Sequence, residues 1–104
     1  MRTPQRDSNE RAIVEALRAA GHLVQHLQQG DGVPDLLVLV GNAPPARWHG
    51  PPVLVLLEVK DGTKKPSAQK LTADQVRWHQ QWFRAPLHIV NSVEQALAAV
   101  RNYE

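Results

Sequence analysis

Two uninterrupted apolar runs constrain the fold of this chain more than any other feature. The first covers residues 36–40 and the second covers residues 53–57, and both consist of leucine and valine alone. Runs of this length and composition are typical of strands. Because the side chains on both alternating faces are apolar, we predict a sheet that is covered by helices on both sides.

The second run ends in Glu58-Val59-Lys60, which places a carboxylate and an ammonium group two residues apart. Side chains of a strand alternate between its faces, so Glu58 and Lys60 point the same way. If the two runs pair antiparallel, the beginning of the first lies beside the end of the second. Asp35 immediately precedes the first run and would then lie next to Glu58 and Lys60.

This set of side chains favours chemistry on phosphates. Two carboxylates can hold a hard divalent cation such as Mg²⁺, which prefers oxygen ligands and keeps several waters. A lysine beside them can orient or activate a water molecule, or stabilise negative charge that develops on a phosphate. We therefore take Asp35, Glu58 and Lys60 as the candidate site.

The other periodicities predict helices and short strands around the two runs. We expect a helix over residues 8–20 and a short edge strand over residues 22–27. A second helix opens at Thr72, a strand covers residues 87–90, and a last helix covers residues 93–103. The predicted order is helix, three strands, helix, strand and helix, which makes an α/β fold.

Glu10 is the acid of the first helix that can approach the sheet. On a helical wheel it lies between Val14 and Leu17, close to the apolar stripe, whereas Glu15 projects from the opposite side. A local role is the alternative, because Asp7-x-x-Glu10 can form a capping pair at the start of the helix. Glu10 is therefore either a ligand of a metal or water at the site, or a capping or solvent-facing residue.

Gln75 also has two interpretations. Thr72-x-x-Gln75 matches a capping box, in which Gln75 would only bond back to the backbone of Thr72. However, Gln75 and His79 fall within the apolar arc of this helix, and a polar residue on an inward face needs a partner. Trp78 and Trp82 lie on the same arc, and we expect them in the core rather than as stacking platforms for nucleic-acid bases.

Basic residues are concentrated downstream of the second apolar run, although the formal net charge of the chain is only +2. Lys64, Lys65, Lys70 and Arg77 are candidates for contacts with DNA phosphates. The alternative is that they form a solvated loop and the outer face of a helix.

The segment 41–52 contains four prolines and two glycines, so it is neither a helix nor a central strand. We interpret it as a projecting hairpin loop. Arg47 and Trp48 at its centre are candidates for contacts with a base or a phosphate of DNA. An equally good interpretation is that Trp48 packs back on the body of the protein.

Composition narrows the class of protein. A chain of 104 residues with 42% hydrophobic residues suits one globular domain, spanning residues 1–104. The absence of cysteine excludes disulfides, thiolate metal sites and a cysteine nucleophile. No apolar run approaches the length of a membrane span, and the N-terminus lacks a signal-peptide core. We expect a cytoplasmic protein of bacterial or phage type that has no membrane partner.

Three short motifs carry a resemblance to a known family. Pro34-Asp35 followed by Glu58-Val59-Lys60 resembles the signature of the PD-(D/E)XK nucleases. With Gly32 and Val33 added before them, and Leu71-Thr72-Ala73-Asp74-Gln75 downstream, the set is similar to the VRR-NUC subgroup and to archaeal Holliday-junction resolvases. The resemblance runs from about Glu10 to Val90. It implies a restriction-endonuclease-like αβββαβ core, with a mixed sheet flanked by helices on both faces.

The resemblance also implies an activity, namely a Mg²⁺- or Mn²⁺-dependent endonuclease that hydrolyses phosphodiester bonds in DNA. The oxygen ligands of the metal would be Asp35, Glu58, the Val59 carbonyl and, directly or through water, Glu10. Lys60 would position the hydrolytic water or stabilise the pentacovalent phosphate, and Gln75 would hold Lys60 or the water. Small nucleases of this kind suggest a homodimer that cuts branched DNA, either Holliday junctions or flaps.

Two other classes of function stay open at this point. The chain could be a non-catalytic nucleic-acid-binding domain on a nuclease scaffold, although binding alone does not require acids near phosphates. It could also be a small structural or interaction subunit in which Glu58 and Lys60 form only a surface salt bridge, a contact that contributes little stability.

Overall fold

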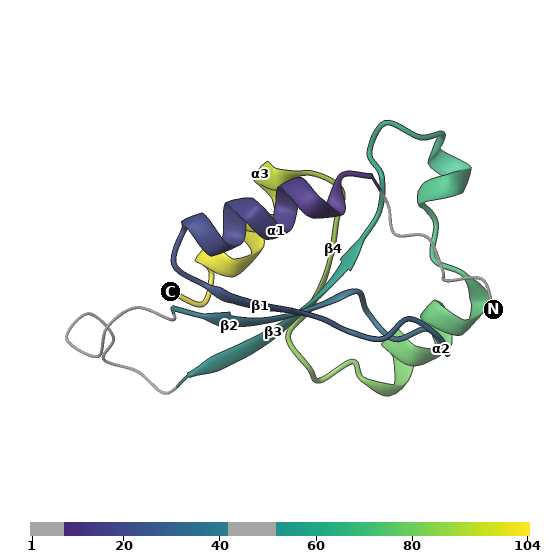
Figure 1. Cartoon of the computed structure of the whole chain (residues 1–104). Helices are drawn as coiled ribbons and strands as arrows, with labels where there is room; N and C mark the ends of the chain where they lie inside the picture. The colour runs from purple at the N-terminus through teal and green to yellow at the C-terminus, as the bar shows by residue number, and fades with distance from the viewer. Residues whose placement is uncertain (1–7, 42–51) are drawn as a thin grey trace.

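The computed structural model describes residues 8–41 and 52–104, and its elements follow the predicted order (Figure 1). They are α1 (Glu10–Ala19), β1 (Leu23–His26), β2 (Leu36–Val40), β3 (Val53–Val59), the 3-10 helix η2 (Pro66–Gln69), α2 (Ala73–Gln81), β4 (Leu87–Val90) and α3 (Val93–Arg101). The short η2 in the loop after β3 is the one addition to the expected elements within these residues.

The four strands form a single mixed sheet in the order β1-β2-β3-β4. β1 pairs antiparallel with β2 and β2 pairs antiparallel with β3, whereas β3 and β4 are parallel. Leu36 at the start of β2 lies opposite Leu57 near the end of β3. The antiparallel pairing that brings the start of β2 to the end of β3 is therefore confirmed.

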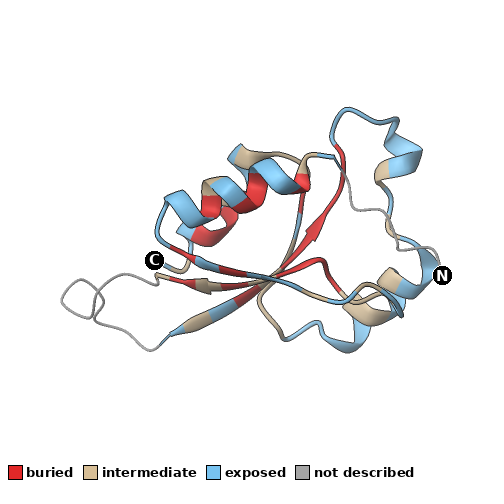
Figure 2. Ribbon diagram, viewed as in Figure 1, coloured by how far each residue is buried: buried red, intermediate tan, exposed pale blue. Residues whose placement is uncertain are grey.

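One face of the sheet is closed by α1 and α3 (Figures 1 and 2). The buried side chains of α1 that reach this layer are Ile13, Val14 and Leu17, and they pack against the alternate apolar residues of the strands. Because Val55, Leu57 and Val59 of β3 point into this layer, Glu58 between them points to the other face.

The second face carries α2, which lies near the carboxyl end of β3 (Figure 1). Helices thus flank both faces of the sheet, as predicted. The cover on this second face is incomplete, because Leu23 is 53% exposed and Leu54 is 55% exposed at the far end of the strands. Within residues 8–41 and 52–104, no helix has the length and apolar character needed to cross a membrane.

Candidate active site

Asp35, which immediately precedes β2, lies beside the end of β3. The Asp35 N–H donates to the carbonyl of Leu57, the residue before Glu58, at 3.1 Å. Both acids are buried, with exposures of 6% for Asp35 and 1% for Glu58.

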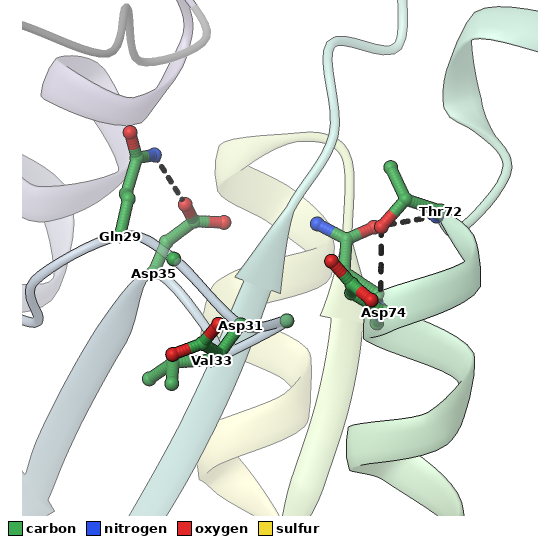
Figure 3. Close-up of a pocket in the computed structure, with 9 residues that line it drawn as sticks. Gln29, Asp31, Val33, Asp35, Thr72 and Asp74 are labelled. Carbon is green, nitrogen blue, oxygen red and sulfur yellow. Dashed lines mark hydrogen bonds between the residues drawn. The ribbon is translucent and has the colours of Figure 1, made fainter.

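The carboxylate of Asp35 is held from two sides. Its Oδ2 accepts a hydrogen bond of 2.7 Å from the Val59 N–H, and its Oδ1 accepts one of 3.0 Å from Gln29 Nε2 (Figure 3). Nothing in the sequence indicated a role for Gln29, because a polar residue in a turn has no periodicity to mark it. These bonds fix the direction of the Asp35 side chain at the sheet end.

Gln75 of α2 connects Lys60 to Glu58. Lys60 Nζ donates to Gln75 Oε1 at 2.8 Å, and Gln75 Nε2 donates to Glu58 Oε2 at 3.2 Å. Glu58 and Lys60 can share this partner because they project from the same face of the chain. Burial of Glu58 also shows that the interpretation as a surface salt bridge is wrong.

The two interpretations of Gln75 are both correct. Thr72 and Gln75 form a complete capping box at the start of α2, in which Gln75 Oε1 accepts from the Thr72 N–H at 2.9 Å. The same oxygen also accepts from Lys60, and the amide nitrogen of Gln75 donates to Glu58. The capping box therefore orients the Gln75 side chain toward the candidate site.

Glu10 is buried, at 2% exposure, and lies at the start of α1 as expected. Its Oε2 is 3.1 Å from Nδ1 of His26, which is opposite Leu36 in the sheet. The N-cap of α1 is Asn9, whose side chain makes no capping hydrogen bond, and Asp7 of the alternative capping pair is outside the described residues. The role of Glu10 stays a prediction.

The donor set fits a small divalent cation with few protein ligands. Over the described ranges 8–41 and 52–104, no group of three or more His, Cys, Asp or Glu side chains is gathered closely enough to hold a metal. Asp35 and Glu58 supply two carboxylates, and the carbonyl of Val59 is adjacent in the chain. Mg²⁺ commonly takes one or two carboxylates and completes its shell with waters and substrate phosphates, so this smaller set is sufficient.

His79 lies one helical turn beyond Gln75 and faces the other oxygen of Glu58. Its Nε2 is 3.8 Å from Glu58 Oε1, which is too long for a hydrogen bond. Burial, and secondly the charge of Lys60, lower the pKa of His79 below its usual 6.5. Both effects favour the neutral form of the imidazole.

A cavity of about 240 Å³ adjoins the site between the loop before β2 and the start of α2 (Figure 3). Asp35 and Gln75 line it, together with Asp31 and Asp74. Gly32 brings the loop so close to α2 that a methyl group on it would be 2.2 Å from the Asp74 carbonyl oxygen. The glycine thus permits a close approach between two segments of the protein.

The predicted DNA-binding residues divide into two groups. Lys64, Lys65, Lys70 and Arg77 are exposed, as a contact with phosphates requires, and Arg77 forms an ion pair of 3.1 Å with Asp74. The second group consists of Arg47 and Trp48, which are outside the described residues. Binding of DNA by either group stays a prediction.

The aromatic residues of α2 do not form the expected core. α2 has no buried residue, and Trp82 is 51% exposed while Phe83 just after the helix is 77% exposed. The prediction that Trp82 is a core residue is therefore wrong. Trp78 is partly buried, and the rings of Trp78 and Trp82 stack with centroids 4.8 Å apart and planes 7° apart.

Comparison with known proteins gives one informative similarity. Neither the models of protein families nor the curated proteins contain a match to this chain. Among solved structures, the chain is similar to a VRR_NUC domain at 27% sequence identity and a TM-score of 0.59. The alignment covers 91% of this chain and 92% of that chain. The predicted resemblance and the VRR-NUC nuclease-like fold are thereby confirmed, and the likeness indicates a nuclease-type domain and hence a hydrolase.

Proposed function

We propose that this chain, which has the fold of a VRR-NUC nuclease domain, is a divalent-metal-dependent endonuclease that hydrolyses phosphodiester bonds in DNA. The observation that carries the proposal is that Asp35 accepts a hydrogen bond of 2.7 Å from the Val59 N–H, next to Glu58, while Gln75 joins Lys60 to Glu58. Two acids and an amine at one sheet end are the groups that metal-assisted phosphoryl chemistry uses.

Asp35, Glu58 and the carbonyl of Val59 would hold the Mg²⁺ or Mn²⁺ ion. The chemistry that such an ion supplies is Lewis-acid stabilisation of charge on the reacting phosphate. Lys60 has three N–H donors, of which one bonds to Gln75, so the others can donate to a phosphate oxygen or a water. Gln75 fixes both Lys60 and Glu58, which limits the reorganisation needed when DNA binds.

The direct test is cleavage of DNA by the purified chain with Mg²⁺ or Mn²⁺, compared with the same reaction in EDTA. We expect cleavage with the metal and none in EDTA, and we expect Glu58→Ala to abolish it. The matched control is Glu15→Ala, since Glu15 is an exposed acid on α1 that pairs with Arg11. Undiminished cleavage by Glu58→Ala would overturn the assignment.

The role of Glu10 can be tested in the same assay. If Glu10 assists the metal directly or through water, Glu10→Gln should lose activity whereas Glu15→Gln should not. Equal activity of the two variants would mean that Glu10 has no part in catalysis.

The substrate that we propose is branched DNA, either a Holliday junction or a flap, cut by a homodimer with one site for each strand. A four-way junction has two-fold symmetry, which a dimer matches. Cleavage of a junction should be compared with cleavage of a linear duplex of the same sequence, and sedimentation should give the mass of the protein in solution. Equal cleavage of both DNAs removes the junction proposal.

A non-catalytic nucleic-acid-binding domain is the second candidate. The exposure of Lys64, Lys65 and Lys70 supports binding of phosphates without requiring a reaction. A metal titration separates the two candidates, because a domain that only binds should have the same DNA affinity with and without a divalent ion and should leave the DNA intact.

A further inference from the structure

Trp78 of α2 and Trp82 at its C-cap form a stacked aromatic pair whose outer ring is half exposed. Trp78 and Trp82 are parallel to within 7°, with a centroid distance of 4.8 Å, so each ring covers one face of the other. Trp82 is nevertheless 51% exposed. A flat aromatic ring with one face supported and the other open to solvent is the arrangement on which a nucleic-acid base can stack.

The position of Trp82 along the helix also suits contact with DNA bound at the candidate site. Gln75 and Trp82 are seven residues apart, which is close to two helical turns, so they lie on the same side of α2 and about 10 Å apart along its axis. Gln75 contacts Glu58 and Lys60 of the candidate site. A stacked strand of DNA rises about 3.4 Å per nucleotide, so this distance corresponds to roughly three nucleotides.

We propose that Trp82 stacks on an unpaired base of the DNA substrate about three nucleotides from the scissile phosphate. The inference rests on the proposed nuclease function and deepens it by naming the substrate class. Bases inside a duplex are covered on both faces by their neighbours, so Trp82 can stack on an unpaired base but not on a base within a duplex. The substrate is therefore DNA with a single-stranded segment beside the cut, as in a flap or a gap.

The surroundings of Trp82 favour a nucleotide over a second copy of the chain. Gln81 immediately before Trp82 and Arg84 two residues after it are exposed, and Arg84 adds a positive charge near Trp82 in the chain. The centre of a protein interface is depleted in charged residues, whereas binding of single strands combines aromatic rings with basic side chains. A surface that mixes a ring with an arginine therefore suits a base and its phosphate.

The test measures DNA affinity without cleavage. Fluorescence anisotropy of a labelled flap and of a fully paired duplex of the same sequence is recorded with the full chain in EDTA. Trp82→Ala is expected to weaken binding of the flap roughly 10- to 100-fold and to leave duplex affinity close to that of the wild type. Trp82→Phe, which keeps an aromatic ring, should restore most of the flap affinity, whereas Trp82→Leu should not.

Phe83→Ala is the matched control, because Phe83 is the neighbouring aromatic residue and is 77% exposed. It should bind both DNAs as the wild type does. Circular dichroism verifies that each variant is folded. Equal weakening of flap and duplex by Trp82→Ala overturns the inference. The inference is also overturned if the wild type is a dimer and Trp82→Ala makes it a monomer without loss of DNA affinity. Trp82 would then contact a second copy of the chain rather than DNA.

Failure of this inference can be told apart from failure of the proposed function. A chain that discriminates flap from duplex through Trp82, but never cuts DNA with Mg²⁺ or Mn²⁺, refutes the nuclease proposal alone. A chain that cuts DNA with metal, but whose Trp82→Ala variant binds the flap normally, refutes the stacking platform alone.

Discussion

Gly32 holds the loop before β2 against the start of α2, and substitution by alanine tests that contact. Its φ is +79°, a left-handed conformation that residues with a Cβ rarely adopt. The added methyl group would be 2.2 Å from the Asp74 carbonyl oxygen and 2.8 Å from the Gln75 nitrogen. Since carbon contacts begin near 3.5 Å, the loop or α2 must move by about 1 Å.

Two costs contribute to the expected loss of stability in Gly32→Ala. The left-handed backbone costs about 1–2 kcal/mol for a residue with a Cβ. Movement of α2 also weakens the bonds of Gln75 to Glu58 and Lys60, and a hydrogen bond to a charged group contributes about 1.5–3 kcal/mol. We expect a total loss of about 3–4 kcal/mol.

Gly21→Ala is the matched control for the backbone cost. Gly21 has a φ of +96°, and a methyl group there would meet nothing within 4 Å. Unfolding in urea, extrapolated to water at one temperature, gives the free energy of each variant. Gly32→Ala should lose about 2 kcal/mol more than Gly21→Ala, and it should also lose DNA cleavage because Gln75 is displaced. Equal losses of stability by the two variants would refute the reasoning.

Two further predictions concern α2 and the loop after β3. Gln75→Ala should lower the free energy of unfolding by about 2 kcal/mol, because it removes a cap and bonds to two charged groups, whereas the exposed Gln80→Ala should change it by less than about 0.5 kcal/mol in the same urea experiment. Hydrogen bonds from the Thr63 hydroxyl and N–H lower the pKa of Asp61 below its usual 3.8, so Asp61 stabilises the fold above that pH and the stabilisation is lost as pH falls through the folded pKa. Asp61→Asn should therefore flatten the dependence of stability on pH between neutral and strongly acid conditions, and an unchanged pH profile would contradict this account.

The position of Asp35 beside the end of β3 could be predicted because it depends on local and short-range rules. Two apolar runs separated by a proline-rich loop pair antiparallel, and the alternation of side chains then places Glu58 and Lys60 on one face. The same rules could not separate the two interpretations of Gln75. A capping pattern describes backbone partners only, and whether the same amide also reaches a strand depends on where the helix docks.

The exposure of Trp82 could not be predicted from the helical wheel. The wheel shows which residues share a face, but how much of that face the sheet covers is a property of the packed structure. α2 lies near the carboxyl end of β3, so its apolar arc extends beyond the strands and has no buried residue. The hydrogen bond from Gln29 to Asp35 could not be predicted for a related reason. Contacts made by loop residues leave no periodic signal in the sequence.

Substitution of Glu58 tests whether its buried charge stabilises the fold or is needed only for metal binding. Burial of a carboxylate charge costs stability, and both Asp35 and Glu58 are buried. Glu58→Gln removes one charge and keeps a side-chain oxygen that can accept from Gln75. In EDTA, the free energy of unfolding of Glu58→Gln should therefore equal or exceed that of the wild type.

A divalent ion should reverse this order. Binding to the folded state alone adds about 2.7 kcal/mol of stability at 100 times the dissociation constant, and Glu58→Gln should gain much less. Urea unfolding of the wild type and of Glu58→Gln, each in EDTA and in excess Mg²⁺, measures both effects. If Glu58→Gln is less stable than the wild type in EDTA, the Glu58 charge stabilises the fold. An equal gain from Mg²⁺ would mean that Glu58 is not a ligand. If neither result is obtained, the Glu58 charge destabilises the protein without metal, and binding of the ion offsets this cost. That is the behaviour expected of a metal ligand.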